Sequence, residues 1–176
     1  SCSCQIENNQ KLLIFANMHG TCAAMTLRNT QISYRDAPEI PAFSDEGPVC
    51  VMDANCALCA RGAMWIAHND HQGAFRIIPL QSDLGAALMR HYGLDPEDPN
   101  SWLFLEDGRA YSSLEALARV GRRLGGIWRS LSVVLILPRP VRNVLYRFVA
   151  RNRYRWFGTA NLCFVPDPEV QKRLIK

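Results

Sequence analysis

The chain has 176 residues, which is enough to bury one hydrophobic core and too few for two well-built domains. Apolar residues make up 48% and charged residues 20%, which excludes a disordered or fibrous protein, and the net charge is only +4. The apolar run at residues 131–137 is far shorter than the roughly 20 residues of a membrane span, so we expect a soluble protein without one.

Seven cysteines, an odd number, are too sparse for a secreted disulfide scaffold and favour a reducing compartment. The apolar run at residues 12–16 is short and follows Glu7, so we expect no cleaved export signal and a cytoplasmic location. Residues 1–46 are expected to be a poorly defined N-terminal extension, because they show no sustained periodicity. Residues 47–176 then form the domain.

The domain begins with an apolar run at residues 49–52, which is typical of a strand buried on both faces. A short turn leads into a helical pattern over residues 57–69. A second strand is expected over residues 75–80, after a crossover long enough for a right-handed parallel unit. Ser82 can cap the following helix, which ends near Tyr92.

Two extended runs separated by Asp107-Gly108 predict a β-hairpin. The capping box at residues 112–115 starts a helix that Gly125-Gly126 terminates. The order β-α-β-α-β-β-α predicts an α/β protein with a thioredoxin-like core. From Trp128 onward we expect one or two additional C-terminal helices packed onto this core through an apolar stripe, which consists of Val141, Val144, Leu145, Phe148 and Val149.

A C-x-x-C motif, Cys56 and Cys59, lies where the first predicted strand gives way to a helix. The first sulfur then faces free backbone N–H groups and the positive end of the helix dipole, which favours thiolate. The expected cycle starts with attack of the Cys56 thiolate on a substrate disulfide. Cys59 then attacks the mixed disulfide and leaves a Cys56–Cys59 disulfide that a thiol reductant must reopen, so the motif requires no cofactor and no metal.

A structural or zinc-binding C-x-x-C is the alternative, because His68 and His71 with the two cysteines imitate a zinc ligand set. In a continuous helix, however, His68 lies roughly 13 Å along the axis from Cys59, too far to share one zinc ion. A pair without redox chemistry would leave a non-enzymatic binding module as the rival function.

The stretch at residues 51–59 resembles the D-x-x-C-x-x-C signature of the DCC family of thiol-disulfide oxidoreductases. The segment at residues 137–142 and the R-x-R-Y-R run within residues 150–158 are similar to that family's closing segments, so the resemblance covers about residues 48–163. It implies a thioredoxin-like fold and protein-disulfide reductase activity. Ala54 and Ala57 replace the family's usual Gly and Pro, which we expect to alter the redox potential without removing a reacting group.

Carried over to this chain, the resemblance makes Cys56 the nucleophile, Cys59 the resolving thiol and Asp53 the signature acid. From its position, Asp53 can shuttle a proton for Cys59 or fix the turn before the helix. Cys163 is a candidate third redox partner or a small core residue. Pro99 stands near where this fold places a cis-proline, although an ordinary trans loop proline is favoured. Cys22 and Cys50 are expected to be structural.

Ten arginines and no acidic residue lie between Arg119 and Arg155. They could form a surface for an acidic partner, nucleic acid or an anionic membrane, but a solvated helical face is favoured and no nucleic-acid partner is expected. Arg151, Arg153 and Arg155 are expected to pair with the acidic segment at residues 95–107. The expected partners are a protein or small-molecule disulfide and a thiol reductant.

Overall fold

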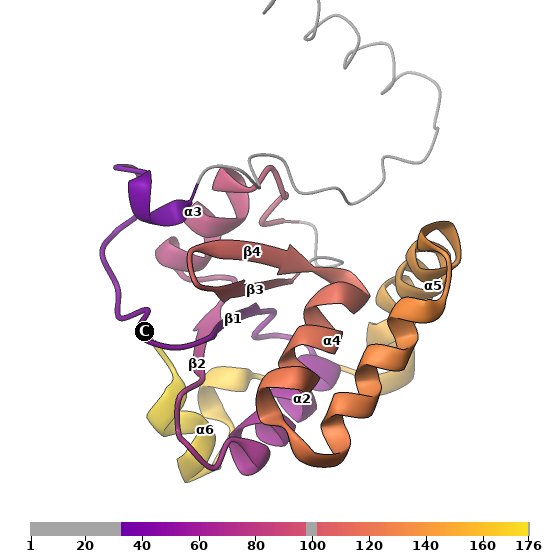
Figure 1. Cartoon of the computed structure of the whole chain (residues 1–176). Coiled ribbons are helices and arrows are strands. Elements are labelled where there is room, and N and C mark those ends of the chain that lie inside the picture. The colour runs from indigo at the N-terminus through magenta and orange to yellow at the C-terminus, as the bar shows by residue number, and fades with distance from the viewer. Residues whose placement is uncertain (1–32, 98–101, 176) are drawn as a thin grey trace, which may run out of the picture.

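A four-stranded mixed sheet forms the centre of the computed structural model, which describes residues 33–97 and 102–175 (Figure 1). Its strands are β1 (Val49–Met52), β2 (Arg76–Pro79), β3 (Leu103–Glu106) and β4 (Arg109–Ser112), in the spatial order β2-β1-β3-β4. β1 is parallel to β2 and antiparallel to β3, and β3 forms the predicted hairpin with β4. The α/β class and the thioredoxin-like order of the core are confirmed.

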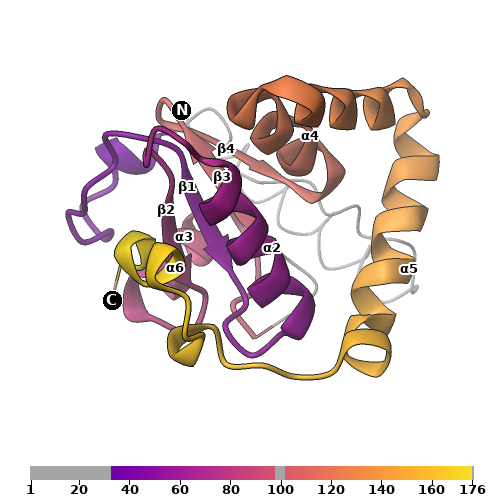
Figure 2. The same ribbon diagram turned by 90° about the horizontal axis from the view of Figure 1, so that it is seen from below.

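Helices cover both faces of the sheet. On one face lie α2 (Ala57–Asn69), α4 (Ser113–Leu124) and α6 (Pro168–Arg173); on the other lie α3 (Asp83–His91) and the short helix η1 (Tyr34–Asp36) (Figures 1 and 2). The chain between α4 and α6 adds η2 (Gly126–Ile136), α5 (Arg139–Phe157) and η3 (Leu162–Phe164). The helix predicted over residues 57–69 is α2, with the same bounds.

Local signals explain where the helices begin and end. The Ser82 hydroxyl accepts a hydrogen bond from the Gly85 N–H at 3.1 Å and so caps α3. Gly125 has a φ of +76°, a conformation that costs a glycine little, and it ends α4 at the predicted place.

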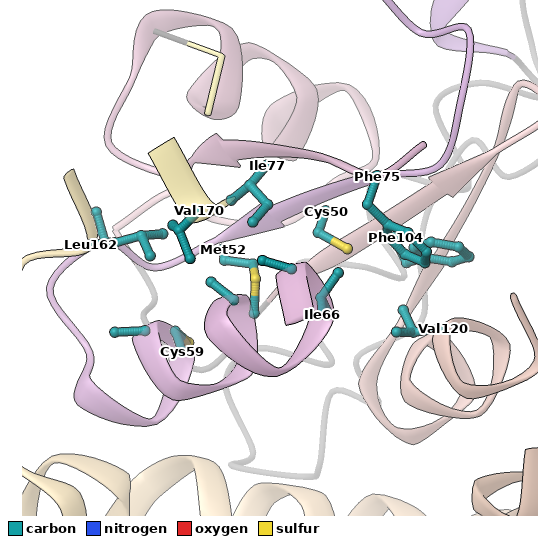
Figure 3. Packing of buried hydrophobic residues seen from close by; sticks show 14 of the residues in the cluster. Cys50, Met52, Cys59, Ile66, Phe75, Ile77, Phe104, Val120, Leu162 and Val170 are labelled. Carbon is teal, nitrogen blue, oxygen red and sulfur yellow. The ribbon is translucent and has the colours of Figure 1, made fainter. Parts of the chain in front are cut away.

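The sheet separates two hydrophobic clusters. β1 is buried along its whole length, and its Cys50 and Met52 side chains face α2 (Figure 3). Burial without a polar partner raises the pKa of the Cys50 thiol far above its usual value, which fits the structural role predicted for this residue. On the opposite face, Tyr34 packs with the residues of α3, so part of the segment before residue 47 contributes to the core.

The orientation of α5 differs from the prediction. The helix packs onto the core as predicted, but not through the apolar stripe. Val141, Val144, Leu145 and Phe148 face solvent, with between 45% and 64% of each residue exposed, and Val149 is half-buried. The opposite side of α5 is buried instead, through Ala150 and Arg153, and α5 contacts α2 and α4. A helical period shows which residues share a face, but it does not show which face the core will take.

The C-terminal segment completes the molecule. Ile175 N–H donates to the Ile77 carbonyl at 2.8 Å, so the chain after α6 adds to the edge of β2. Arg173 pairs with Asp70 at 3.2 Å, and both side chains are buried. Within the described ranges, no helix has the length and apolar character needed to cross a membrane.

Candidate active site

The two cysteines of the motif lie at the N-terminus of α2. Residues 53–55 form the turn after β1, and Cys56 is the N-cap residue of α2 in an extended conformation, with a φ of −101° and a ψ of 124°. The backbone N–H groups of Leu58 and Cys59, in the first turn of the helix, are directed toward the Cys56 sulfur. Cys59 follows within the first turn, and both cysteines are free thiols in this structure.

The two thiols have opposite acid–base properties. The pKa of Cys56 is lowered to about 6, chiefly because the Cys59 thiol donates a hydrogen bond to its thiolate. Backbone N–H groups of α2 and the positive charge of Arg153 lower it further, while burial opposes them. The pKa of Cys59 is raised far above its usual value by the same hydrogen bond and by burial. The two opposite shifts favour a thiolate on Cys56 and a proton on Cys59.

Asp53 is buried beneath this pair and accepts four hydrogen bonds. One carboxylate oxygen accepts from the Asn55 N–H at 2.9 Å and from the Gln81 side-chain amide at 2.7 Å. The other accepts from Arg153 at 2.6 Å and from the Tyr154 hydroxyl. The bond to Asn55 holds the turn that precedes Cys56, and the bonds to α5 attach that helix to the site.

Arg153 connects the carboxylate to the cysteines. One terminal nitrogen of its guanidinium contacts Asp53, and the other lies 3.8 Å from the Cys59 sulfur. The Asp53 and Arg153 side chains are only 1% and 5% exposed, so solvent screens their ion pair little. Burial and the hydrogen bond to Asp53 raise the pKa of Tyr154 to about 12, so this hydroxyl stays protonated as a donor.

The segment after α5 covers Cys56. Thr159 forms an antiparallel bridge with Cys56, in which the Ala57 N–H donates to the Gly158 carbonyl at 3.3 Å and the Ala160 N–H donates to the Asn55 carbonyl at 3.1 Å. Cys56 has no solvent-exposed surface. A reagent that reacts with its sulfur is therefore expected to need movement of the structure around it, and this segment is one part of that structure.

The site brings together Cys56, Cys59 and Asp53, which sequence reasoning had singled out. Gln81, Arg153 and Tyr154 were missed. The predicted pairing of Arg153 with residues 95–107 is wrong, because its guanidinium binds Asp53. The R-x-R-Y-R run that contains Arg153 and Tyr154 was the available signal, but sequence alone gave no contact between it and a residue 100 positions earlier.

The other candidate residues from the sequence do not join the cluster around Cys56 and Cys59. Cys163 is half-buried and packs against the core cluster on the α2 face. His68 pairs with Asp167 at 2.7 Å. Among the described residues, no three His, Cys, Asp or Glu side chains gather in a group that could hold a metal ion. Pro99 and Cys22 lie outside the described residues.

Comparison with known proteins relates the sequence of this chain to a family. The DCC1-like thiol-disulfide oxidoreductase family matches residues 50–159, a range that includes both cysteines and Asp53 with its hydrogen-bond partners. The chain is 37% identical over 127 residues to the uncharacterized protein YuxK of Bacillus subtilis, covering 72% of this chain and 93% of YuxK.

It is also 32% identical over 120 residues to a chloroplastic DCC family protein of Arabidopsis thaliana, covering 68% of this chain and 70% of that protein. No solved structure matches the chain. The family match and the identity to the two relatives agree, and the chain belongs to the DCC1-like thiol-disulfide oxidoreductase family.

Proposed function

We propose that the chain is a thiol-disulfide oxidoreductase of the protein-disulfide reductase type, with Cys56 as the nucleophile and Cys59 as the resolving thiol. The observation that carries the proposal is the unequal pair of thiols at the N-terminus of α2. Cys56 is poised as a thiolate with a pKa of about 6, and Cys59 keeps its proton beside it. This is the division of roles that a two-step exchange requires.

In the first step the Cys56 thiolate attacks one sulfur of the substrate disulfide. A bond forms between Cys56 and that sulfur, the substrate S–S bond breaks, and the other substrate sulfur leaves as a thiolate that takes a proton from solvent. In the second step Cys59 loses its proton and attacks the Cys56 sulfur, which releases the second substrate thiol. The substrate gains two electrons and two protons, and a thiol reductant reopens the Cys56–Cys59 disulfide.

Arg153 and Asp53 act on the second step. Cys59 must become a thiolate to attack, and the guanidinium 3.8 Å from its sulfur is placed to stabilise that charge. Four hydrogen bonds to Asp53 support its role as a positioning residue that fixes both the turn and Arg153. The competing role, in which Asp53 accepts the Cys59 proton, predicts that Asp53→Asn slows release of substrate from the mixed disulfide even when the Arg153 position is kept.

A redox titration of the purified chain in graded glutathione buffers tests the proposal. We expect one two-electron transition that is lost in both Cys56→Ser and Cys59→Ser, together with reduction of insulin disulfides by the wild-type chain. Cys163→Ser is the matched control and should keep the transition, because Cys163 packs against the core outside the pair. Loss of the transition in Cys163→Ser, its survival in Cys56→Ser, or bound zinc that depends on Cys56 and Cys59, would contradict the proposal.

A further inference from the structure

The outer face of α5 carries an exposed apolar stripe. Val141, Val144, Leu145 and Phe148 recur at helical spacing and face away from α2 and α4. Trp156, about half exposed, extends the stripe toward the end of the helix, and its ring meets that of Phe148 edge to face with centroids 5.4 Å apart. We call these five residues the α5 face. A stripe of this kind costs solvation free energy unless something covers it.

The chain segment that contains the α5 face is basic. No aspartate or glutamate occurs from residue 116 to residue 166. Arg151 and Arg155 are exposed beside the stripe, and neither forms an ion pair with any residue in the described part of the chain. The partner of this face must therefore offer both negative charge and apolar volume.

We propose that the α5 face docks on the surface of an anionic lipid membrane. An amphipathic helix with Leu, Phe and Trp on one side and arginines beside them lies in the plane of the interface, with its apolar side chains among the upper acyl chains. Anionic headgroups neutralise the arginines at the same depth. The chain would bind as a peripheral protein, since no described helix is suited to crossing a membrane.

The charge of the face argues against other occupants. A second copy of the chain joined through the same face would bring Arg151 and Arg155 against their own equivalents, which repel each other. Nucleic acid would neutralise the arginines, but it would leave the five aliphatic and aromatic side chains of the α5 face against a polar backbone. An anionic bilayer offers negative headgroups to the arginines and acyl chains to the apolar side chains.

Docking in this way would bring the redox pair close to the bilayer. Trp156 stands two residues before Gly158, whose carbonyl accepts the Ala57 N–H next to Cys56. Figure 2 shows α5 along one side of the molecule, with its C-terminal end leading into the segment that covers the site. If the proposed thiol chemistry holds, which this step alone requires, the substrates are disulfides presented at a membrane surface.

Sedimentation of the purified full chain with vesicles tests the docking. We expect binding to vesicles of phosphatidylcholine with phosphatidylglycerol, weak binding to phosphatidylcholine alone, and release as salt is raised. Replacing both Arg151 and Arg155 with Gln should weaken binding by roughly fivefold for each arginine removed. Phe148→Ser should weaken it by roughly tenfold, because a buried aromatic ring is lost.

Arg90→Gln is the matched control and should bind as the wild type does, since Arg90 is exposed on α3 across the sheet. Circular dichroism checks that each variant is folded. Insulin reduction in solution should be unchanged in Phe148→Ser, so that a failure of docking is separable from a failure of the redox chemistry.

Three outcomes would overturn the proposal. The first is a wild-type chain that stays in the supernatant with anionic vesicles. The second is binding that persists undiminished in Phe148→Ser and in the double arginine variant. The third is a dimer in sedimentation velocity that Phe148→Ser converts to monomer, which would assign the face to a second copy.

Discussion

At the scale of single residues, the hydrogen bond between Cys56 and Cys59 sets the acidity of the two thiols. The hydrogen bond from the Cys59 thiol makes Cys56 a better acid and Cys59 a poorer one. In the proposed exchange, the same bond would therefore favour attack by Cys56 in the first step and oppose deprotonation of Cys59 in the second. Arg153 favours thiolate at both sulfurs, and we propose it as the group that offsets the second effect.

The reactivity of Cys56 should follow its lowered pKa. Only the thiolate reacts with iodoacetamide, so the rate of Cys56 alkylation should fall as pH drops through about 6 and should be level at neutral pH. In Cys59→Ala the donated hydrogen bond is absent, and the midpoint should move up toward the ordinary value of about 8.5. Peptide mass spectrometry measures the rate at each pH. A Cys163→Ala control should match the wild type, and identical profiles for wild type and Cys59→Ala would refute the assigned cause.

The Asp53–Arg153 pair is expected to contribute strongly to stability. Removing either partner leaves a buried charge without compensation, so Asp53→Asn and Arg153→Met should each lower the free energy of unfolding by about 3 kcal/mol. The double variant should lose at least about 1 kcal/mol less than the sum. Urea titration measures all three. Arg151→Met, exposed on the same helix, should stay within about 0.5 kcal/mol of wild type, and strict additivity would show that the two residues do not interact.

At the scale of secondary-structure elements, the site is an assembly of three parts. β1 and its turn supply Asp53, α2 supplies the cysteines, and α5 supplies Arg153 and Tyr154. The first two are adjacent in sequence, and strand, turn and helix each have a local signal. Helix α5 is distant in sequence and joins the other two parts only through tertiary contacts. Sequence patterns therefore located the cysteines but did not show that Arg153 lies beside them.

The segment over Cys56 should limit how fast the thiolate is reached. Ala160→Pro removes the N–H that donates to the Asn55 carbonyl, and one lost hydrogen bond of about 1 kcal/mol corresponds to roughly fivefold faster alkylation of Cys56 at neutral pH. Ala160→Ser keeps the N–H and serves as the control, so its rate should equal that of wild type. An unchanged rate in a folded Ala160→Pro variant would show that this segment does not gate access.

At the scale of the whole molecule, the chain after residue 166 is expected to be a structural part of the domain. Val170 is fully buried, Arg173 pairs with Asp70, and Ile175 bonds to the edge of β2. Deleting residues 167–176 should lower the free energy of unfolding by at least about 3 kcal/mol, because it exposes apolar surface and leaves Asp70 without its partner. Urea titration checks this. Lys172→Gln, exposed on the same helix, should have little effect, and a deletion as stable as wild type would contradict the prediction.

The sequence predicted the core of the fold well, for physical reasons. The unbroken apolar run of β1, the Asp-Gly turn and the Ser82 cap are local features, so neighbouring residues suffice to recognise them. The orientation of α5 was predicted wrongly because both of its faces carry apolar residues, and a buried arginine on the less apolar face is the one that binds the site. Hydrophobicity alone favours burial of the apolar stripe of α5, whereas the structure buries the face that carries Arg153, which pairs with Asp53.

The antiparallel bridge between Cys56 and Thr159 also bears on which disulfides can react. A protein substrate held as an extended strand would need the same backbone groups, the Asn55 carbonyl and the Ala57 N–H, that the chain now satisfies internally. Such a substrate must displace the residues that now pair with Cys56. Its apparent affinity is then the intrinsic affinity multiplied by the fraction of molecules in which those residues are displaced. A small disulfide needs no backbone pairing and escapes part of this competition. If the proposed exchange occurs, we expect the covering segment to compete with extended protein substrates more strongly than with small disulfides.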